Sequence, residues 1–203
     1  PFMSTYNVHI LSWEEGNKEI TFPYTKDCSY ESFLRVTSVR EVGGGNGLGV
    51  YQGLVDAFFT KNGLPITDPE SNYHEEGFST GIDKRNTNWE HGTGVAGEVT
   101  DKGTYNMYCN REPRFYNAVT FNGAWLTYLN RKADFFYNHS DNIRSSSPHD
   151  APQNGYLARK GLRMTDNIKV QWTGRQAFIY RLAFTYLDYA EAENEAHDTK
   201  EAR

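Results

Sequence analysis

The sequence predicts a mainly α-helical protein with long irregular loops and a small antiparallel β-sheet. Residues 176–196 carry one long amphipathic pattern. Residues 67–110 and 126–154 are polar and lack helical or strand periodicity. Two short segments, within residues 111–125 and 155–162, have strand character. With 203 residues, we expect a single region of structure in which residues 67–110 form a long loop insertion.

The pattern in residues 176–196 predicts the longest helix. Ile179, Ala183, Tyr186 and Ala190 recur at helical spacing and share one face. Phe178, Leu182 and Tyr189 widen this apolar stripe, and charged residues occupy the opposite face. So much aromatic area needs a packing partner.

The predicted start of this helix is Thr173, because Gln176 follows it at the spacing of a capping box. No other segment has comparable periodicity over four turns. Either the helix packs on irregular structure, or its helical partners lie outside these residues. The chain also starts at Pro1, and we expect it to be a piece of a longer polypeptide.

Two shorter helices are expected earlier in the chain. Residues 51–59 place four apolar residues on one side, and Lys61, Gly63 and Pro65 then stop the helix. Residues 29–39 are consistent with a short helix or a turn. Between them, residues 40–50 form a glycine-rich loop whose spacing does not match a phosphate-binding motif.

The strands are predicted from alternation and β-propensity. Ile20 and Phe22 alternate with polar residues, and Pro23 ends or edges the strand. Residues 111–125 predict a strand followed by a turn at Asn122-Gly123. We expect residues 155–162 to pair with that strand in an antiparallel manner.

The composition favours the binding of sugars over that of nucleic acid. The net charge is −5 and the pI about 5.7, without a basic cluster. Aromatic residues reach 15%, mostly Tyr and Phe, and rings provide flat apolar faces on which sugars stack. No apolar run is long enough to cross a membrane.

No catalytic or zinc-binding motif is present. Adjacent carboxylates such as Glu14-Glu15 are typical of solvated surface, and no histidine has metal-ligand spacing. We therefore expect no cofactor. A structural calcium ion in the Asp- and Asn-rich loops stays an open alternative, and no residues are assigned to a metal site. Cys28 and Cys109 are either paired or two separate thiols.

Four segments together resemble one protein family. REPRFYNAVTFNGAW (111–125) resembles the "DPRFY" segment of the SusD/RagB family of nutrient-binding lipoproteins. NKEITFPYTKD (17–27), YQGLVDAFFTKNGLPITD (51–68) and GYLARKGL with IYRLAFTYLDYAEAENEA (155–196) are similar to further family segments in the same order. The chain departs from the pattern at Phe184, where the family has Glu. The likeness covers only the middle and back of a family member.

The resemblance implies a SusD-like fold with tetratricopeptide-type helices, most of them in an N-terminal part that this chain lacks. It also implies a non-catalytic protein on the outer-membrane surface, lipid-anchored through that other part. Such proteins capture oligosaccharides for a SusC-like, TonB-dependent transporter. A packing partner for the helix at 176–196 would lie in the same N-terminal part.

The ligand residues of this family vary between members, so candidates are chosen by position and chemistry. Stacking rings are predicted at Tyr51, Tyr73, Trp89 and Tyr105, and hydrogen-bonding amides at Asn46 and Asn88. Arg114 and Tyr116 are assigned to structure. Two alternatives stay open: an oligopeptide-binding member of the same family, and a glycan-processing enzyme, which would need two convergent carboxylates.

Overall fold

The computed structural model describes residues 2–24, 30–85, 97–175 and 177–196. Within these residues the helices are α1 (Phe2–Ile10), α2 (Tyr30–Thr37), η1 (Arg40–Val42), α3 (Gln52–Ala57), η2 (Pro69–Ser71), η3 (Asn106–Tyr108), α4 (Pro113–Ala118), η4 (Thr127–Leu129), η5 (Pro148–Asp150) and α5 (Leu182–Glu195). The strands are β1 (Ile20–Pro23), β2 (Asp83–Lys84), β3 (Glu98–Thr100), β4 (Val119–Thr120), β5 (Trp125–Leu126), β6 (Arg131–Lys132), β7 (Leu157–Ala158) and β8 (Phe178–Arg181).

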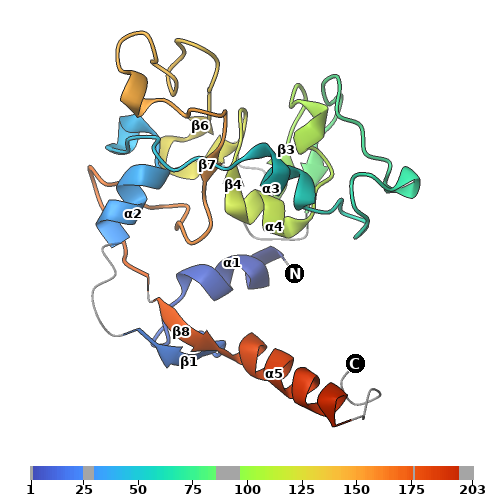
Figure 1. The fold of residues 1–203 in the computed structure, drawn as a ribbon. Helices are drawn as coiled ribbons and strands as arrows, with labels where there is room; N and C mark the ends of the chain where they lie inside the picture. The colour runs from blue at the N-terminus through green and yellow to red at the C-terminus, as the bar shows by residue number, and fades with distance from the viewer. Residues whose placement is uncertain (1, 25–29, 86–96, 176, 197–203) are drawn as a thin grey trace.

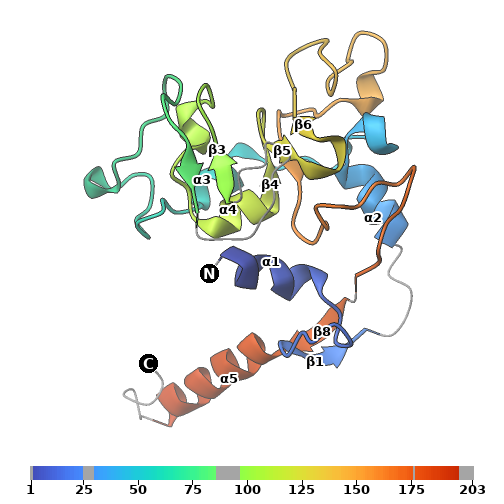
Figure 2. The same cartoon turned by 180° about the vertical axis from the view of Figure 1, so that it is seen from behind.

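These elements form a loop-rich body and a projecting arm. Figures 1 and 2 show α2, α3, α4 and the short strands in the body, with α1 lying beneath α4. The arm, which consists of β1, β8 and α5, extends below α1. No helix in the described part of the chain has the length and apolar character needed to cross a membrane.

The strands pair in four separate two-stranded antiparallel ladders: β1 with β8, β2 with β3, β4 with β7, and β5 with β6. The expected pairing of residues 155–162 with the 111–125 segment is confirmed, because Val119 lies opposite Ala158 and Thr120 opposite Leu157. The predicted turn at Asn122-Gly123 is also present. Gly123 has φ +89°, and the amide of Ala124 donates to the carbonyl of Phe121 at 2.9 Å.

The strand prediction for residues 111–125 is wrong over its first half, which forms α4. Pro113 stands in the first turn, where its fixed φ suits a helix and its missing N–H removes no bond. The helix buries Phe115 and Tyr116, and strand geometry begins only at the β-branched pair Val119 and Thr120.

The helix prediction for residues 176–196 is wrong at its start. Phe178–Arg181 is strand β8, so α5 begins at Leu182 with Arg181, and not Thr173, as its N-cap residue. Strand β1 provides the competing interaction: Phe22 lies opposite Tyr180, and the amide of Leu182 donates to the Glu19 carbonyl at 2.8 Å. A distant partner therefore overrides the local helical pattern.

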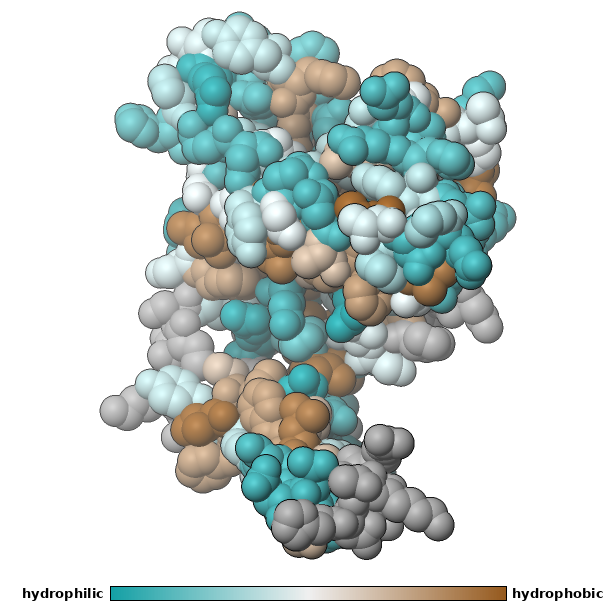
Figure 3. Space-filling view, turned by 45° about the vertical axis from the view of Figure 1, so that its right-hand side comes forward, coloured by the Kyte–Doolittle hydropathy of each residue, from teal (hydrophilic) through white to brown (hydrophobic). Residues whose placement is uncertain are grey.

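Helix α5 has no buried residue, and the Tyr186 side chain is 66% exposed. Figure 3 shows apolar residues gathered over the arm, giving way to polar residues toward the end of α5. Neither a helix nor irregular structure among the described residues buries this face of α5.

The main core lies between α1, α3 and α4 and is rich in aromatic rings. Phe115 stacks on Phe121 with ring centroids 5.5 Å apart, and Tyr108 stacks on Phe121 at 4.7 Å. Phe2 of α1 and Val55 of α3 complete the packing. Offset aromatic pairs add to the hydrophobic stabilisation of area burial alone.

Arg111 is fully buried in this core. Its guanidinium donates to the carbonyls of Val55 (2.5 Å), Phe58 (2.8 Å) and Met107 (3.0 Å). The first two carbonyls belong to the C-terminal end of α3, where a helix leaves acceptors unpaired. Arg111 therefore joins α3 to the segment that enters α4.

A second core, around Val39, Leu126, Phe135 and Leu157, supports the loop between residues 131 and 147. Within that loop, the Asp141 carboxylate accepts two hydrogen bonds from Arg131, at 2.7 and 2.8 Å, and one from the backbone amide of Asp134 at 2.8 Å.

Candidate functional site

A cleft of about 560 Å³ lies between the 77–108 region and the loop that follows β6. We call it the aromatic cleft, because several rings line it. Its described lining residues are Phe78, Asp101, Lys102, Gly103, Thr104, Tyr105, Tyr108, Asn122, Gly123, Lys132, Phe135, Phe136 and Gly155. This size suits a small organic ligand or part of an oligomeric one.

Phe78 and Tyr105 form one aromatic part of the cleft. The two residues are bridged as in an antiparallel ladder, and their rings meet edge to face with centroids 5.7 Å apart. Flanking hydrogen bonds hold both segments: the amide of Ser79 donates to the Thr104 carbonyl at 2.7 Å, and that of Asn106 to the Gly77 carbonyl at 3.0 Å. Phe78 is nevertheless 65% exposed, so its face is free to contact a ligand.

Phe135 and Phe136 provide the other aromatic part. Phe135 is buried, and its amide donates to the Asn122 side-chain oxygen at 2.7 Å. This anchor leaves Phe136 59% exposed, with its ring edge to face against His139 at 5.5 Å. A rigid base thus carries a solvent-facing ring, which is the arrangement that ring stacking requires.

Polar groups complete the lining. Lys132 forms an ion pair with Asp101, whose other oxygen accepts from the Thr104 hydroxyl at 3.3 Å. Lys102 adds an exposed ammonium group. Burial, and then the neighbouring Tyr156, raises the pKa of Tyr108, so this phenol stays protonated at neutral pH.

Of the predicted stacking residues, the structure places Tyr105 in the aromatic cleft. Tyr51 is exposed at the start of α3, outside the described cleft lining. Tyr73 is half-buried, with the Arg111 guanidinium 5.5 Å from its ring centre, and burial raises its pKa to about 12. Trp89 and Asn88 lie outside the described residues.

Asn46 is held inside the fold. Its side chain is only 1% exposed, and its amide donates to the carbonyls of Asp141 (3.1 Å) and Asp150 (2.6 Å). Its backbone has φ +52°, a left-handed conformation that Asn tolerates. In this structure the Asn46 side chain ties the glycine-rich loop to the 141–150 segment.

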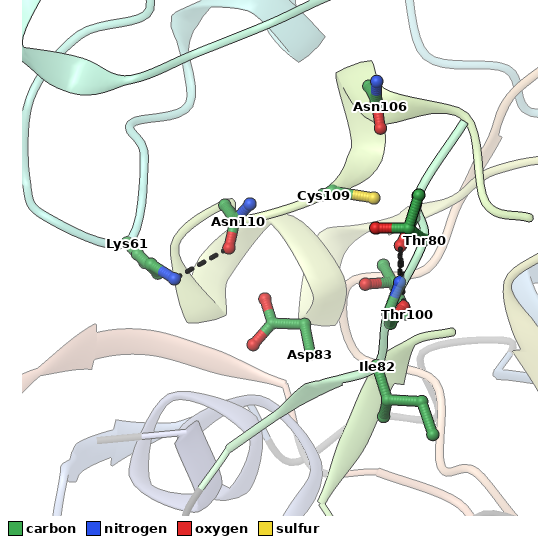
Figure 4. A pocket seen from close by; sticks show the side chains of 10 residues that line it. Lys61, Thr80, Ile82, Asp83, Thr100, Asn106, Cys109 and Asn110 are labelled. Carbon is green, nitrogen blue, oxygen red and sulfur yellow. Dashed lines mark hydrogen bonds between the residues drawn. The ribbon is translucent and has the colours of Figure 1, made fainter. Parts of the chain in front are cut away.

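A smaller polar pocket of about 320 Å³ lies nearby (Figure 4). Lys61 donates to the Asn110 side-chain oxygen at 2.8 Å, and Asp83 pairs with Arg85 at 2.7 Å. Cys109 also lines it, and burial raises the pKa of its thiol, which disfavours the reactive thiolate. Cys28 lies outside the described residues, so the question of pairing stays open.

The described residues contain no group of three or more His, Cys, Asp or Glu side chains that could hold a metal ion. The sequence-based expectation of a structural calcium ion remains untested.

Several cleft residues are not among the ligand-binding candidates identified from the sequence, namely Phe78, Asp101, Asn122, Lys132, Phe135 and Phe136. A usable signal existed in the DFFYN run (134–138), where consecutive rings stand in a polar loop. A contiguous group of exposed apolar rings is typical of a binding surface.

Comparison with known proteins gives a consistent result. The model of the family described as the SusD family matches residues 13–203. The fold is similar to a SusD-like protein from Bacteroides fragilis NCTC 9343, with TM-score 0.59 and 23% identity over 98% of this chain and 36% of that one. It is also similar to a structure named BT4246, with TM-score 0.63 and 20% identity over 99% of this chain and 34% of that one. This chain therefore spans about a third of those structures. No curated protein sequence matched.

Proposed function

Because this chain belongs to the SusD family, we propose that it binds oligosaccharides through the aromatic cleft, as the non-catalytic binding component of a nutrient-uptake system. The observation that carries this proposal is the pair of exposed rings, Phe78 and Phe136, lining one cleft. Sugar rings present apolar C–H faces that stack on such rings, while their hydroxyl groups need polar partners.

The polar groups of the cleft meet the second requirement. Asp101 and Asn122 offer acceptors, and Lys102 and Lys132 offer donors. They surround the rings without producing a strong net charge, which favours a neutral, hydroxyl-rich ligand.

The cleft does not support glycoside hydrolysis. That reaction normally needs two carboxyl groups across the bound sugar. Among the described lining residues Asp101 is the sole carboxylate, and it is already paired with Lys132. This arrangement supports a binding role over an enzymatic one.

We further propose that the intact protein acts at the outer-membrane surface, lipid-anchored through a part outside this chain, and delivers its ligand to a SusC-like, TonB-dependent transporter. Family membership supports this assignment. Co-purification of the intact protein with such a transporter from detergent-solubilised membranes tests it, and recovery without any outer-membrane transporter contradicts it.

The ligand proposal is tested by calorimetry of the chain against a panel of neutral oligosaccharides, with Phe136→Ala and Phe78→Ala variants. Losing one stacking ring should weaken binding about fivefold to tenfold, because an aromatic contact contributes roughly 1 kcal/mol. Tyr137→Ala is the matched control: Tyr137 is 64% exposed beside Phe136 but lies outside the described cleft lining.

Three outcomes would contradict the proposal. Equal effects of Phe136→Ala and Tyr137→Ala would remove the cleft as the site. Binding of oligopeptides in place of sugars would favour the alternative ligand class. Release of reducing ends from a bound glycan would show enzymatic activity.

A further inference from the structure

A second pocket, of about 340 Å³, lies where α1, α3, α4 and β7 meet. We call it the basic pocket. Its described lining residues are Thr5, His9, Val50, Leu54, Phe58, Arg114, Asn117, Ala118, Ala158 and Lys160. It shares no lining residue with the aromatic cleft. It therefore offers a separate place for a ligand.

The charges in this pocket have one sign. His9, Arg114 and Lys160 line it, and no described lining residue is a carboxylate. No hydrogen bond or ion pair joins the side chain of His9 or Lys160 to another described residue, whereas the Arg114 side chain is bonded to Glu112. The Lys160 ammonium is therefore the charge in the described lining that has no counter-ion among the described residues.

The electrostatic environment agrees with the geometry. Burial, and then the nearby charges of Lys160, Arg181 and Arg175, together lower the pKa of His9 to about 4. Burial and the same two arginines, together with Arg114, lower the pKa of Lys160. The nearby arginines disfavour the protonated form of Lys160, so a bound anion would stabilise that form.

The remaining lining is mixed. Leu54 and Phe58 give an apolar side, with the Phe58 ring fixed edge to face on Phe115 at 5.7 Å. Thr5 and Asn117 add a hydroxyl and an amide. A fitting ligand therefore carries an anionic group, an apolar face and hydroxyl groups together.

From this combination we infer that the basic pocket binds the carboxylate of an acidic sugar, such as a uronic acid. The assignment of a sugar, and with it of a carboxylate as the anion, rests on the proposed function, whereas the assignment of an anionic group rests on the pocket. Lys160 is the main anion partner, because it is exposed and unpaired among the described residues. At neutral pH the imidazole of His9 is uncharged and serves as a hydrogen-bonding group.

Glucuronate and glucose are the decisive probes, because they differ in the carboxylate that the pocket would recognise. The measurement is a heteronuclear NMR titration of the chain at pH 7 and low salt. We expect glucuronate to shift the signals of His9 and its neighbours on α1 in a saturable manner, and glucose at equal concentration not to. Added sodium chloride should weaken this binding.

Lys160→Met keeps the aliphatic stem and removes the charge. It should weaken glucuronate binding about tenfold, the order expected for a charge-assisted hydrogen bond. Lys169→Met is the matched control, because it removes the same charge from an exposed lysine outside the pocket lining. Unchanged spectra elsewhere in both variants verify folding.

The inference is overturned by equal binding of glucose and glucuronate, or by equal effects of the two methionine variants. It is also overturned if glucuronate shifts only aromatic-cleft signals. Loss of neutral-sugar binding in Phe136→Ala with intact glucuronate shifts at His9 would separate the two sites. If the aromatic cleft does not bind sugars, the glucuronate titration therefore still tests the basic pocket.

Discussion

Arg111→Met gives the strongest single test of how the body is held together. Arg111 is 0% exposed and donates to three carbonyls, of Val55, Phe58 and Met107. Methionine fills much of the volume but leaves these acceptors unpaired inside the core. Bonds from a charged donor contribute about 1.5–3 kcal/mol each.

Three such bonds set an upper limit of about 4.5–9 kcal/mol. Burial opposes them, since it disfavours the charged guanidinium and lowers the pKa of Arg111. We therefore expect the free energy of unfolding to fall by about 3–5 kcal/mol, because three buried carbonyls lose their donor.

Urea denaturation followed by tryptophan fluorescence measures this change as a lower midpoint at constant slope. Arg114→Met is the control, because Arg114 lies three residues away, is mostly exposed and pairs with the neighbouring Glu112. It should cost less than about 1 kcal/mol. A loss below about 1 kcal/mol for Arg111→Met as well would refute the reasoning.

Three further predictions concern other regions. Asp141→Asn should lower the free energy of unfolding, measured by thermal denaturation, by about 2–3 kcal/mol, because it weakens the two bonds from Arg131 and loosens the loop that carries Phe136. Asp134→Asn changes a more exposed carboxyl and should lower it less; the reverse order would contradict this reasoning. Gly44→Ala should destabilise by roughly 2–4 kcal/mol, since a Cβ there would lie 1.9 Å from the Ser38 carbonyl oxygen, whereas Gly81→Ala meets open space and should be near neutral. For His9, the folded pKa of about 4 lies below the unfolded value of about 6.5, so its contribution is complete above about pH 6.5 and is lost as pH falls toward 4. His9→Gln should flatten the stability profile in that window, and an unchanged profile would show that other groups dominate.

The sequence predicts much of the fold where the deciding interactions are local. Helix α3 lies within the predicted 51–59 segment, and Pro23 closes β1 as its ring geometry requires. The β4–β7 pairing joins segments distant in sequence, yet it was also predictable because both carry short β-forming patterns between turn residues.

The two errors in secondary structure have different causes, one of which is a partner distant in sequence. The apolar residues of 178–181 fit a helical stripe and a strand equally well, and only pairing with β1 decides between them. In residues 113–118, the aromatic residues suggested a strand, but the proline and the burial of Phe115 favour a helix.

The same limit applies to the aromatic cleft. Tyr105 was predictable as a ring in a polar loop, yet its neighbour Phe78 comes from a segment that pairs with it through backbone contacts. Phe135 and Phe136 join them through an anchor on Asn122. Which loop rings share a surface depends on these contacts, and no periodicity in the sequence encodes them.

The pairing of β1 with β8 links residues near both ends of the chain, and this affects how the molecule opens. Closing so long a loop carries an entropy cost, and the ladder that repays it has only two strands with an irregular register. The arm should therefore unfold on its own while the body stays intact, as a separate low-stability unit. Amide hydrogens of β8 and α5 would then exchange with solvent well before those of α4. In folding, the arm would form late, because β8 follows β1 only after the long stretch of sequence that forms the body.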